Sequence, residues 1–558
     1  MSWRRLGSLA ARSAWALGLL AVCGAVVVGT AALPVPDTQV VPPLSVDVPA
    51  PSTVLVCPGL LRLPTEPEPG ADVVFDPEFD PAPGDAITAV RAVSVRPPGA
   101  DAAAGVGLRP VGAAGVVDQI AAAAAVGTSS LPVAEVGLAL RGDAVGAVPA
   151  WIGGAVLVQT DAGDLRGLAA APCQYPSAES WLVGGSTVLG SSARLVLSNP
   201  GQTAATVTVR IWGANGQVEL AGAPEYLVPP GSERAVLLEG VAAEQSRIVV
   251  QTLASGGLVT AYLQDSRLAG LVPAGVDYVV SGQQPAQRQV VVGLALAGAG
   301  EPATPEDPVA DDAGTDPAEP PSADPGTADP TGTPDPGVGD PDPGGQSTDV
   351  EAAGPGAVRA ARLRLLAPGA DAATVDLTFL GADGEYELPG TRGLRLVPGE
   401  VLDVPLDALP GGDYAVLVDA DVPVVAAAML STPAGEGGEL DRVWVPSVPL
   451  GAVGPLALPE GAAGQLLLAA VGAATVTIEV IGIDGVLAEL EVQVPAATTV
   501  VLPLAGLAPA EQELAGIVIR TADDVAWAVT LTAPGDMVAA LTPVPPLAPQ
   551  PQVSARVR

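Results

Sequence analysis

The side chains that most often carry enzyme chemistry are missing from this chain. Its 558 residues include no His, and all 24 basic residues are Arg, so there is also no Lys. Without His there is no imidazole general base, no Ser-His-Asp triad and no His ligand for zinc. Without Lys there is no Schiff-base nucleophile and no P-loop lysine. Most common enzyme classes are therefore excluded.

Carboxylates remain as candidate catalytic groups. The 61 Asp and Glu residues could supply an acid–base pair of the kind that glycosidases use. No two of them stand out from the rest. Three Gly-x-x-Gly sequences begin at Gly213, Gly381 and Gly482, but no helix is expected after them, as a phosphate site would require. We therefore expect a protein that is not an enzyme, with no catalytic residues, no cofactor and no metal site.

The N-terminus carries a candidate membrane span. Arg4, Arg5 and Arg12 precede an uncharged run at residues 14–33, which is long enough to cross a bilayer as a helix. Basic residues before the span place the N-terminus inside and the bulk of the chain outside. Small residues at 29–32 also fit a cleavable secretory signal, although the apolar region of such signals is usually shorter. We expect a single-pass signal anchor in the cell membrane with an extracellular bulk, or a secreted protein if the signal is cleaved.

Two of the three cysteines are expected to pair. Cys23 lies inside the apolar run, which leaves Cys57 and Cys173 in the exported part. Disulfides persist outside the cytoplasm, so this even number predicts a Cys57–Cys173 bond. Closing so long a loop would contribute about 4–5 kcal/mol in the chain-entropy account.

The net charge of −37 argues against nucleic acid as a partner. Binding to phosphates needs clustered Lys or Arg, whereas this chain has an excess of carboxylates. A solvated anionic surface is the simpler interpretation, and an acidic ligand-binding face is the alternative.

An internal repeat is the strongest signal for the fold. Ala-Ala-Thr-Val begins at Ala204, Ala372 and Ala473, and Gly-x-x-Gly follows at the same distance each time. Such a repeat indicates one supersecondary unit copied along the chain. Apolar and polar residues alternate over 207–211 and its equivalents, which predicts a half-buried strand that ends in a tight Asn-Gly or Asp-Gly turn.

About seven short strands in each copy predict an all-β chain of tandem immunoglobulin-like antiparallel β-sandwiches. A β-propeller is the alternative, but the copies look too long and too few to close a ring. The expected organisation is a cytoplasmic N-terminus (1–13), a transmembrane anchor (14–33), a divergent disulfide-bonded sandwich (45–178), three further sandwiches (179–286, 287–439 and 440–545) and a Pro-rich tail (546–558).

Similar short sequences are expected to open the four copies: Thr53–Val56, Ser180–Val183, Arg288–Val291 and Arg442–Val445.

The first copy diverges from the others. Ala155–Val158 matches Ala415–Val418, and Leu168–Ala171 follows it as a partner strand. On this register the two exported cysteines end the first and last strands, so their disulfide would join the two edges of this sandwich. Asp118–Val126 is expected to form a short helix.

Residues 301–356 contain thirteen Pro, fourteen acidic residues and no aromatic residue. Such a segment cannot bury apolar surface, and we expect it to be disordered. The opening strand of the third copy, Arg288–Val291, precedes the segment, and its second strand, Arg362–Leu365, follows it. The segment is therefore expected to be a loop expanded within one sandwich, which costs little additional closure entropy.

The tryptophans beyond the apolar run could stack on sugars if they were exposed. Their expected positions in strands favour core packing instead, and burial of all of them would count against glycan binding. They are Trp151, Trp181, Trp212, Trp444 and Trp527.

Several short sequences resemble an uncharacterised family of exported or membrane-anchored actinobacterial proteins, over most of residues 50–545. The resemblance implies no activity. It is carried by Gly167–Cys173, Trp181–Gly185, Arg194–Gly201 and Val228–Gly231.

We therefore expect a non-catalytic, envelope-anchored extracellular structural or interaction protein. Its partners would be the cell membrane and an envelope protein or polysaccharide. The alternative is a glycan-binding accessory protein of cell-envelope polysaccharide assembly or export.

Overall fold

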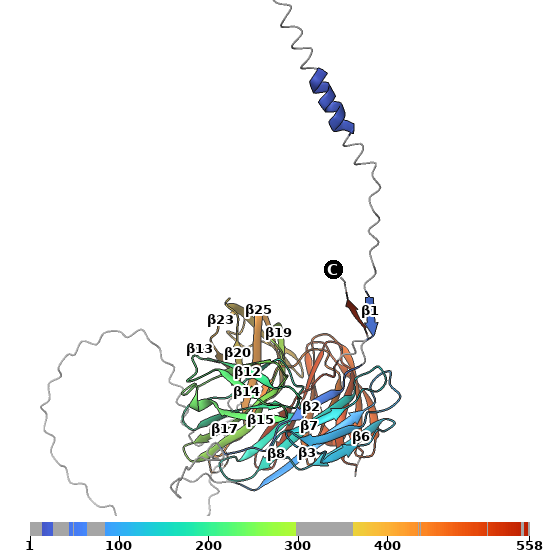
Figure 1. Ribbon diagram of the computed structural model, residues 1–558. Helices are drawn as coiled ribbons and strands as arrows, with labels where there is room; N and C mark the ends of the chain where they lie inside the picture. The colour runs from blue at the N-terminus through green and yellow to red at the C-terminus, as the bar shows by residue number, and fades with distance from the viewer. Residues whose placement is uncertain are drawn as a thin grey trace, which may run out of the picture. The chain divides into compact units, whose positions relative to one another are not determined.

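The computed structural model describes residues 14–25, 44–47, 50–63, 84–296, 361–433, 435, 437–509, 512–547 and 552–555. The chain divides into a unit of residues 50–549 and a unit formed by its two ends. In the latter, residues 14–25 form a helix, and β1 (Leu44–Asp47) pairs with β35 (Gln552–Ala555), as Figure 1 shows. Residues 26–33 of the expected span lie outside the described part. Among the helices described, none has both the length and the apolar character needed to cross a membrane.

The described residues within 50–549 form four antiparallel β-sandwiches, so the predicted all-β class is confirmed. In the first sandwich one sheet has the order β2-β7-β4-β5 and the other β6-β3-β8-β9. Its strands are β2 (Thr53–Cys57), β3 (Ala86–Val95), β4 (Val106–Pro110), β5 (Asp118–Ile120), β6 (Val126–Leu131), β7 (Leu138–Gly142), β8 (Trp151–Thr160) and β9 (Gly167–Pro172).

The second sandwich repeats this plan with the orders β10-β16-β12-β13 and β15-β11-β17-β18, and β14 also pairs with β12. Its elements are β10 (Glu179–Val183), β11 (Ser191–Asn199), β12 (Ala205–Gly213), β13 (Gly216–Val218), β14 (Glu225–Val228), β15 (Ser232–Leu237), the 3-10 helix η1 (Leu238–Gly240), β16 (Val249–Ser255), β17 (Thr260–Ala269) and β18 (Val272–Val280).

In the third sandwich one long strand, β25, passes from one sheet to the other. Its first half pairs with β19 and β21, and its second half pairs with β20 and β26. The strands are β19 (Ala286–Leu296), β20 (Ala361–Leu366), β21 (Ala373–Gly381), β22 (Gly384–Tyr386), β23 (Leu394–Leu396), β24 (Leu402–Pro405), β25 (Gly412–Ser431) and β26 (Arg442–Pro446).

Because β19 and β20 both pair with β25, the chain on either side of residues 297–360 enters the same sandwich. The acidic segment itself, 301–356, lies outside the described residues.

The fourth sandwich has the orders β27-β32-β29-β30 and β31-β28-β33-β34. Its elements are β27 (Gly454–Ala457), β28 (Ala463–Ala470), β29 (Ala474–Gly482), β30 (Val486–Val494), β31 (Thr498–Pro503), the 3-10 helix η2 (Leu504–Gly506), β32 (Leu514–Thr521), β33 (Val525–Ala533) and β34 (Met537–Leu541).

The shared strand order differs from that of an immunoglobulin domain, which corrects this part of the prediction. Leaving aside the short hairpin strands, the fifth strand of each copy lies between the first and third, and the second lies between the fourth and sixth. In immunoglobulin domains the second strand instead lies between the first and fifth. Alternating residues and turn signals predict strands, but they do not specify which strands pair across the sandwich.

Three local expectations are also wrong. Arg442–Val445 does not open the fourth copy, because β26 pairs with β25 and closes the third. Residues 118–126 form β5 and the start of β6 instead of a helix. Ala155–Val158 lies in β8, the strand before the last of its copy, whereas Ala415–Val418 lies in the first half of β25, one strand earlier in its copy. Similar short apolar sequences occupy different places in the copies, so they do not fix the register.

The four sandwiches close a ring through their last strands. β9 contacts β18 and β34, and β26 contacts the same two strands. The expectation that four copies are too few to close a ring is therefore wrong. Each copy is a two-sheet sandwich, which is thicker than the single sheet of a propeller blade, so fewer copies surround the centre.

Apolar side chains fill every junction of this ring. Tyr278 packs with the first core, Trp444 with the second, Leu467 against the outer face of the third sandwich, and Leu157 with the fourth core. Burial at these junctions makes residues 50–549 one continuous unit.

Candidate functional site

A buried carboxylate, that of Asp441, lies where the last strands meet. Its Oδ2 accepts hydrogen bonds from the backbone N–H of Leu168 in β9 (2.9 Å) and of Val538 in β34 (3.0 Å). Its Oδ1 accepts the N–H of Arg442 in β26 (2.9 Å). The backbone of Val276 in β18 also stabilises the charged form, which lowers its pKa. One carboxylate thus accepts backbone hydrogen bonds from the first, third and fourth sandwiches.

Two glycines allow this close approach. A Cβ atom at Gly167 would lie 2.5 Å from Oδ1 of Asp441, and one at Gly275 would lie 2.6 Å from the backbone nitrogen of Arg442. Gly275 also has a φ of +95°, which L side chains rarely adopt. Larger residues here would force the last strands of the sandwiches apart.

Two further buried acids join the second and third sandwiches. Asp277 Oδ2 accepts the backbone N–H of Trp444 (2.6 Å), and Asp265 Oδ2 accepts its indole N–H (2.8 Å). Asp265 Oδ2 also lies 2.9 Å from Nη2 of Arg442. We call Asp265, Asp277, Asp441 and Arg442 the central polar cluster.

Burial dominates the electrostatics of this cluster. It raises the pKa of Asp441 to about 7, against the backbone N–H groups that lower it. Burial also raises the pKa of Asp277 well above its usual value, and the nearby Asp441 and Asp265 add to this shift. Burial lowers the pKa of Arg442, which the Asp265 carboxylate opposes. The cluster has three carboxyl groups and one guanidinium, so protonation of Asp277 makes its net charge less negative.

Shifted carboxyl pKa values occur in catalytic sites and in structural ion networks. Here each member of the central polar cluster is at most 6% exposed, so substrates have no access to it. Among the described residues, no group of three or more His, Cys, Asp or Glu is arranged to hold a metal ion. The arrangement can therefore hold the four sandwiches together, but it cannot present reactive groups to solvent.

A buried arginine strengthens the junction between the second and third sandwiches. Arg364 in β20 forms a two-pronged ion pair with Asp403 (2.8 and 2.9 Å). It also donates hydrogen bonds to the carbonyl oxygens of Gly185 (2.7 Å) and Ile248 (3.1 Å) in the second sandwich. The Arg364 guanidinium therefore bridges two copies of the repeat.

A second buried arginine occupies the equivalent position in the first sandwich. Arg91 lies opposite Ala155 of β8, as Arg364 lies opposite Ala427 of β25. Arg91 pairs with Glu513 of the fourth sandwich. This ion pair connects the first and last members of the ring.

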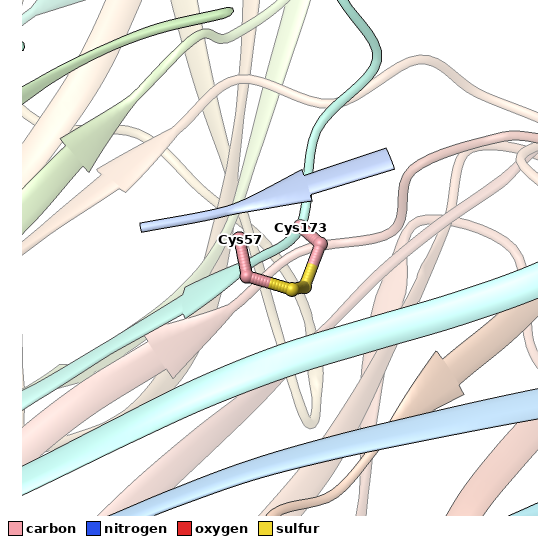
Figure 2. The surroundings of a disulfide bond; sticks show 2 residues. All are labelled: Cys57 and Cys173. Atoms are coloured by element: carbon pink, nitrogen blue, oxygen red, sulfur yellow. A yellow bond between two sulfur atoms is a disulfide. The ribbon is translucent and has the colours of Figure 1, made fainter. Parts of the chain in front are cut away.

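Cys57 and Cys173 form a disulfide bond, as the sequence predicts (Figure 2). Cys57 ends β2, an edge strand of one sheet, and Cys173 follows β9, an edge strand of the other. Both cysteines are fully buried. The bond joins the first and last strands of the first sandwich.

The tryptophans confirm the prediction of core packing. Their exposed fractions are 9% for Trp151, 3% for Trp181, 6% for Trp212, 5% for Trp444 and 0% for Trp527. Trp181 and Trp212 stack with ring centroids 5.2 Å apart. These five rings are not available to stack on a sugar.

Solvent does reach a cleft between the first and second sandwiches, with a volume of about 1130 Å³. The outer faces of β2, β4 and β7 form one wall, with Arg109 and Arg141 among its side chains. Turns of the second sandwich near Gly201 and Gly257 form the other wall. Sequence patterns do not indicate this cleft, because its two walls lie in different copies of the repeat.

The chain belongs to a family of unknown function (DUF5719), which matches residues 122–505. The matched range extends from the first sandwich to the fourth and contains the whole central polar cluster. A search of curated proteins finds no match to this chain.

Proposed function

We propose that this protein is a non-catalytic scaffold of the cell envelope that presents a rigid ring of four sandwiches to an envelope partner. The observation that carries the proposal is the Asp441 carboxylate, which accepts backbone hydrogen bonds from three of the four sandwiches. A buried carboxylate of this kind fixes the relative positions of the sandwiches and leaves their outer loops free for contacts.

The location outside the cytoplasm rests on two features. The Cys57–Cys173 disulfide requires an oxidising compartment to persist. The apolar run at residues 14–33, preceded by three arginines, would anchor the chain with its bulk outside. Protease added to intact cells should degrade the full chain, and fractionation should recover it with membranes. A chain protected in intact cells would contradict this location.

The scaffold function is tested by binding without turnover. Full-length protein is immobilised and exposed separately to purified envelope proteins and to purified envelope polysaccharides. We expect saturable binding of an envelope protein that is left chemically unchanged. Release of a shortened product would show an enzyme and overturn the proposal, as would the absence of any binding.

The same experiment distinguishes the scaffold from the alternative, a glycan-binding accessory protein. Binding of polysaccharide alone would support it. The burial of all five tryptophans counts against recognition of sugars by stacking on these rings.

A further inference from the structure

Two arginines lie side by side in the cleft between the first and second sandwiches. Arg141 of β7 pairs with Gly107 of β4, and Arg109 of β4 pairs with Ala139 of β7. This diagonal placement on one face of the sheet separates the Cα atoms of the two arginines by about 7–8 Å. Both arginines are exposed.

The cleft is positively charged in a chain whose net charge is −37. Among the described residues that line it, none is acidic. An adjoining cavity shares both arginines and contains one carboxylate, that of Asp143. Two adjacent guanidinium groups repel each other and destabilise the sheet unless negative charge lies nearby. An anionic ligand would supply that charge and accept hydrogen bonds from both groups.

An edge strand also borders the same cleft. β2 lies at the end of its sheet, and Val54 and Ser52 line the cleft. The backbone N–H and C=O of Val56 bond to Gln174 on the outer side of β2 (2.8 and 2.9 Å). Backbone groups alternate in direction along an antiparallel strand, so those of Val54 face the same outer side. No strand among the described residues pairs with β2 at Val54 on that side.

We infer that this cleft binds an extended acidic peptide segment of a partner protein, which adds as a strand to β2 at Val54. An added strand would lie roughly 10 Å from β7, since each strand is spaced by about 4.8 Å. Carboxylates on its cleft-facing side would then meet the side chain of Arg141 and, further in, that of Arg109. A strand edge supplies backbone donors and acceptors at the spacing of a peptide backbone, which favours a peptide as the ligand.

This inference rests on the proposed scaffold function, and it names the partner chemistry and the surface. The probe is an eight-residue peptide of alternating Glu and Val, titrated into the full-length protein. We expect binding that weakens as salt rises, because exposed charge pairs are screened. We also expect that Arg141→Glu and Arg109→Glu each weaken it by roughly tenfold or more.

The strand edge is tested separately by Val54→Pro. Proline is tolerated on an edge strand where the N–H faces away from the sheet, so the fold should persist while the added strand loses a hydrogen bond. Arg395→Glu is the matched control, because it makes the same charge change at an exposed site on β23 of the third sandwich. Thermal unfolding of each variant shows whether it is folded.

The inference stands if Arg109→Glu, Arg141→Glu and Val54→Pro weaken the peptide while Arg395→Glu does not. It is overturned if the peptide does not bind, or if folded variants bind it unchanged. Polygalacturonate serves as an anionic polysaccharide, and arginine-dependent binding of it alone would assign the cleft to glycans. If an envelope protein binds the scaffold but ignores these substitutions, the scaffold function holds and this site is wrong.

Discussion

Arg91 and Glu513 form an ion pair across 422 residues of sequence, and this pair joins the first sandwich to the fourth. The side chain of Arg91 is 3% exposed, whereas that of Glu513 is 40% exposed. Removing Glu513 therefore leaves a buried guanidinium unpaired, whereas removing Arg91 leaves a carboxylate that water can reach.

Removing Glu513 should cost more stability than removing Arg91. Glu513→Ala leaves a buried guanidinium without its carboxylate, and we expect a loss of about 2–3 kcal/mol, below the full value for a buried pair because Glu513 is half exposed. Arg91→Met leaves a carboxylate that water can solvate, so the loss should be smaller. Urea unfolding measures both. Arg288→Met, in an exposed pair with Asp419, is the control and should cost about 0–1 kcal/mol.

Asp441→Ala should destabilise the whole ring. The substitution leaves the backbone N–H groups of Leu168, Arg442 and Val538 without an acceptor in the interior. Each unsatisfied group costs about 1–3 kcal/mol, so the total should reach roughly 3 kcal/mol or more. Hydrogen exchange at Leu168 and Val538 should accelerate in the variant. Equal protection in Asp441→Ala and in the exposed control Asp371→Ala would contradict this role.

Stability should fall as pH rises through neutrality. The pKa of Asp441 is raised to about 7 in the folded protein, and that of Asp277 is also raised. Unfolded Asp titrates near pH 4, so the folded state binds more protons between about pH 4 and 7. The contribution of these groups is complete below about pH 4 and is lost as pH rises through the folded values.

Thermal midpoints measured from pH 5 to pH 8 test this sign. The decrease should become shallower in Asp277→Asn, which removes one of the two raised carboxyl groups. A midpoint that rises steadily over this range would show that the central polar cluster is ionised throughout.

Reduction of the Cys57–Cys173 disulfide should weaken the first sandwich most. The bond closes a loop with a sequence separation of 116 residues, and losing it should cost about 2–5 kcal/mol. The Cys57→Ser, Cys173→Ser double variant should melt at the temperature of the reduced protein, well below the oxidised one. Cys23→Ser, outside residues 50–549, is the control and should melt like the unchanged protein.

The sequence predicted most strands of the repeat, because their signals are local. β12, β21 and β29 coincide with the three alternating segments. Positive φ angles occur at Gly216, Gly384 and Gly485, but not at the Asn or Asp before each glycine. The disulfide followed from counting cysteines in an exported chain. These inferences need only neighbouring residues or composition.

Contacts between copies were not predictable from such signals. Asp441 precedes a strand and gives no hint that it meets Leu168 of another copy. A partial signal existed at Asp265 and Asp277, which are single acids inside strands whose other residues are mostly buried. A buried acid must have partners, but its sequence position does not say which ones.

The ring cannot close until the fourth sandwich has been synthesised. Glu513 is synthesised 422 residues after Arg91. At about 5–20 residues per second, the fourth sandwich is therefore synthesised on the order of 20–80 s after the first. During that interval, solvent reaches the apolar surface around Val93 and Leu157, which the fourth sandwich later covers. A chain that folds as it emerges would therefore expose this apolar surface until its last sandwich is complete.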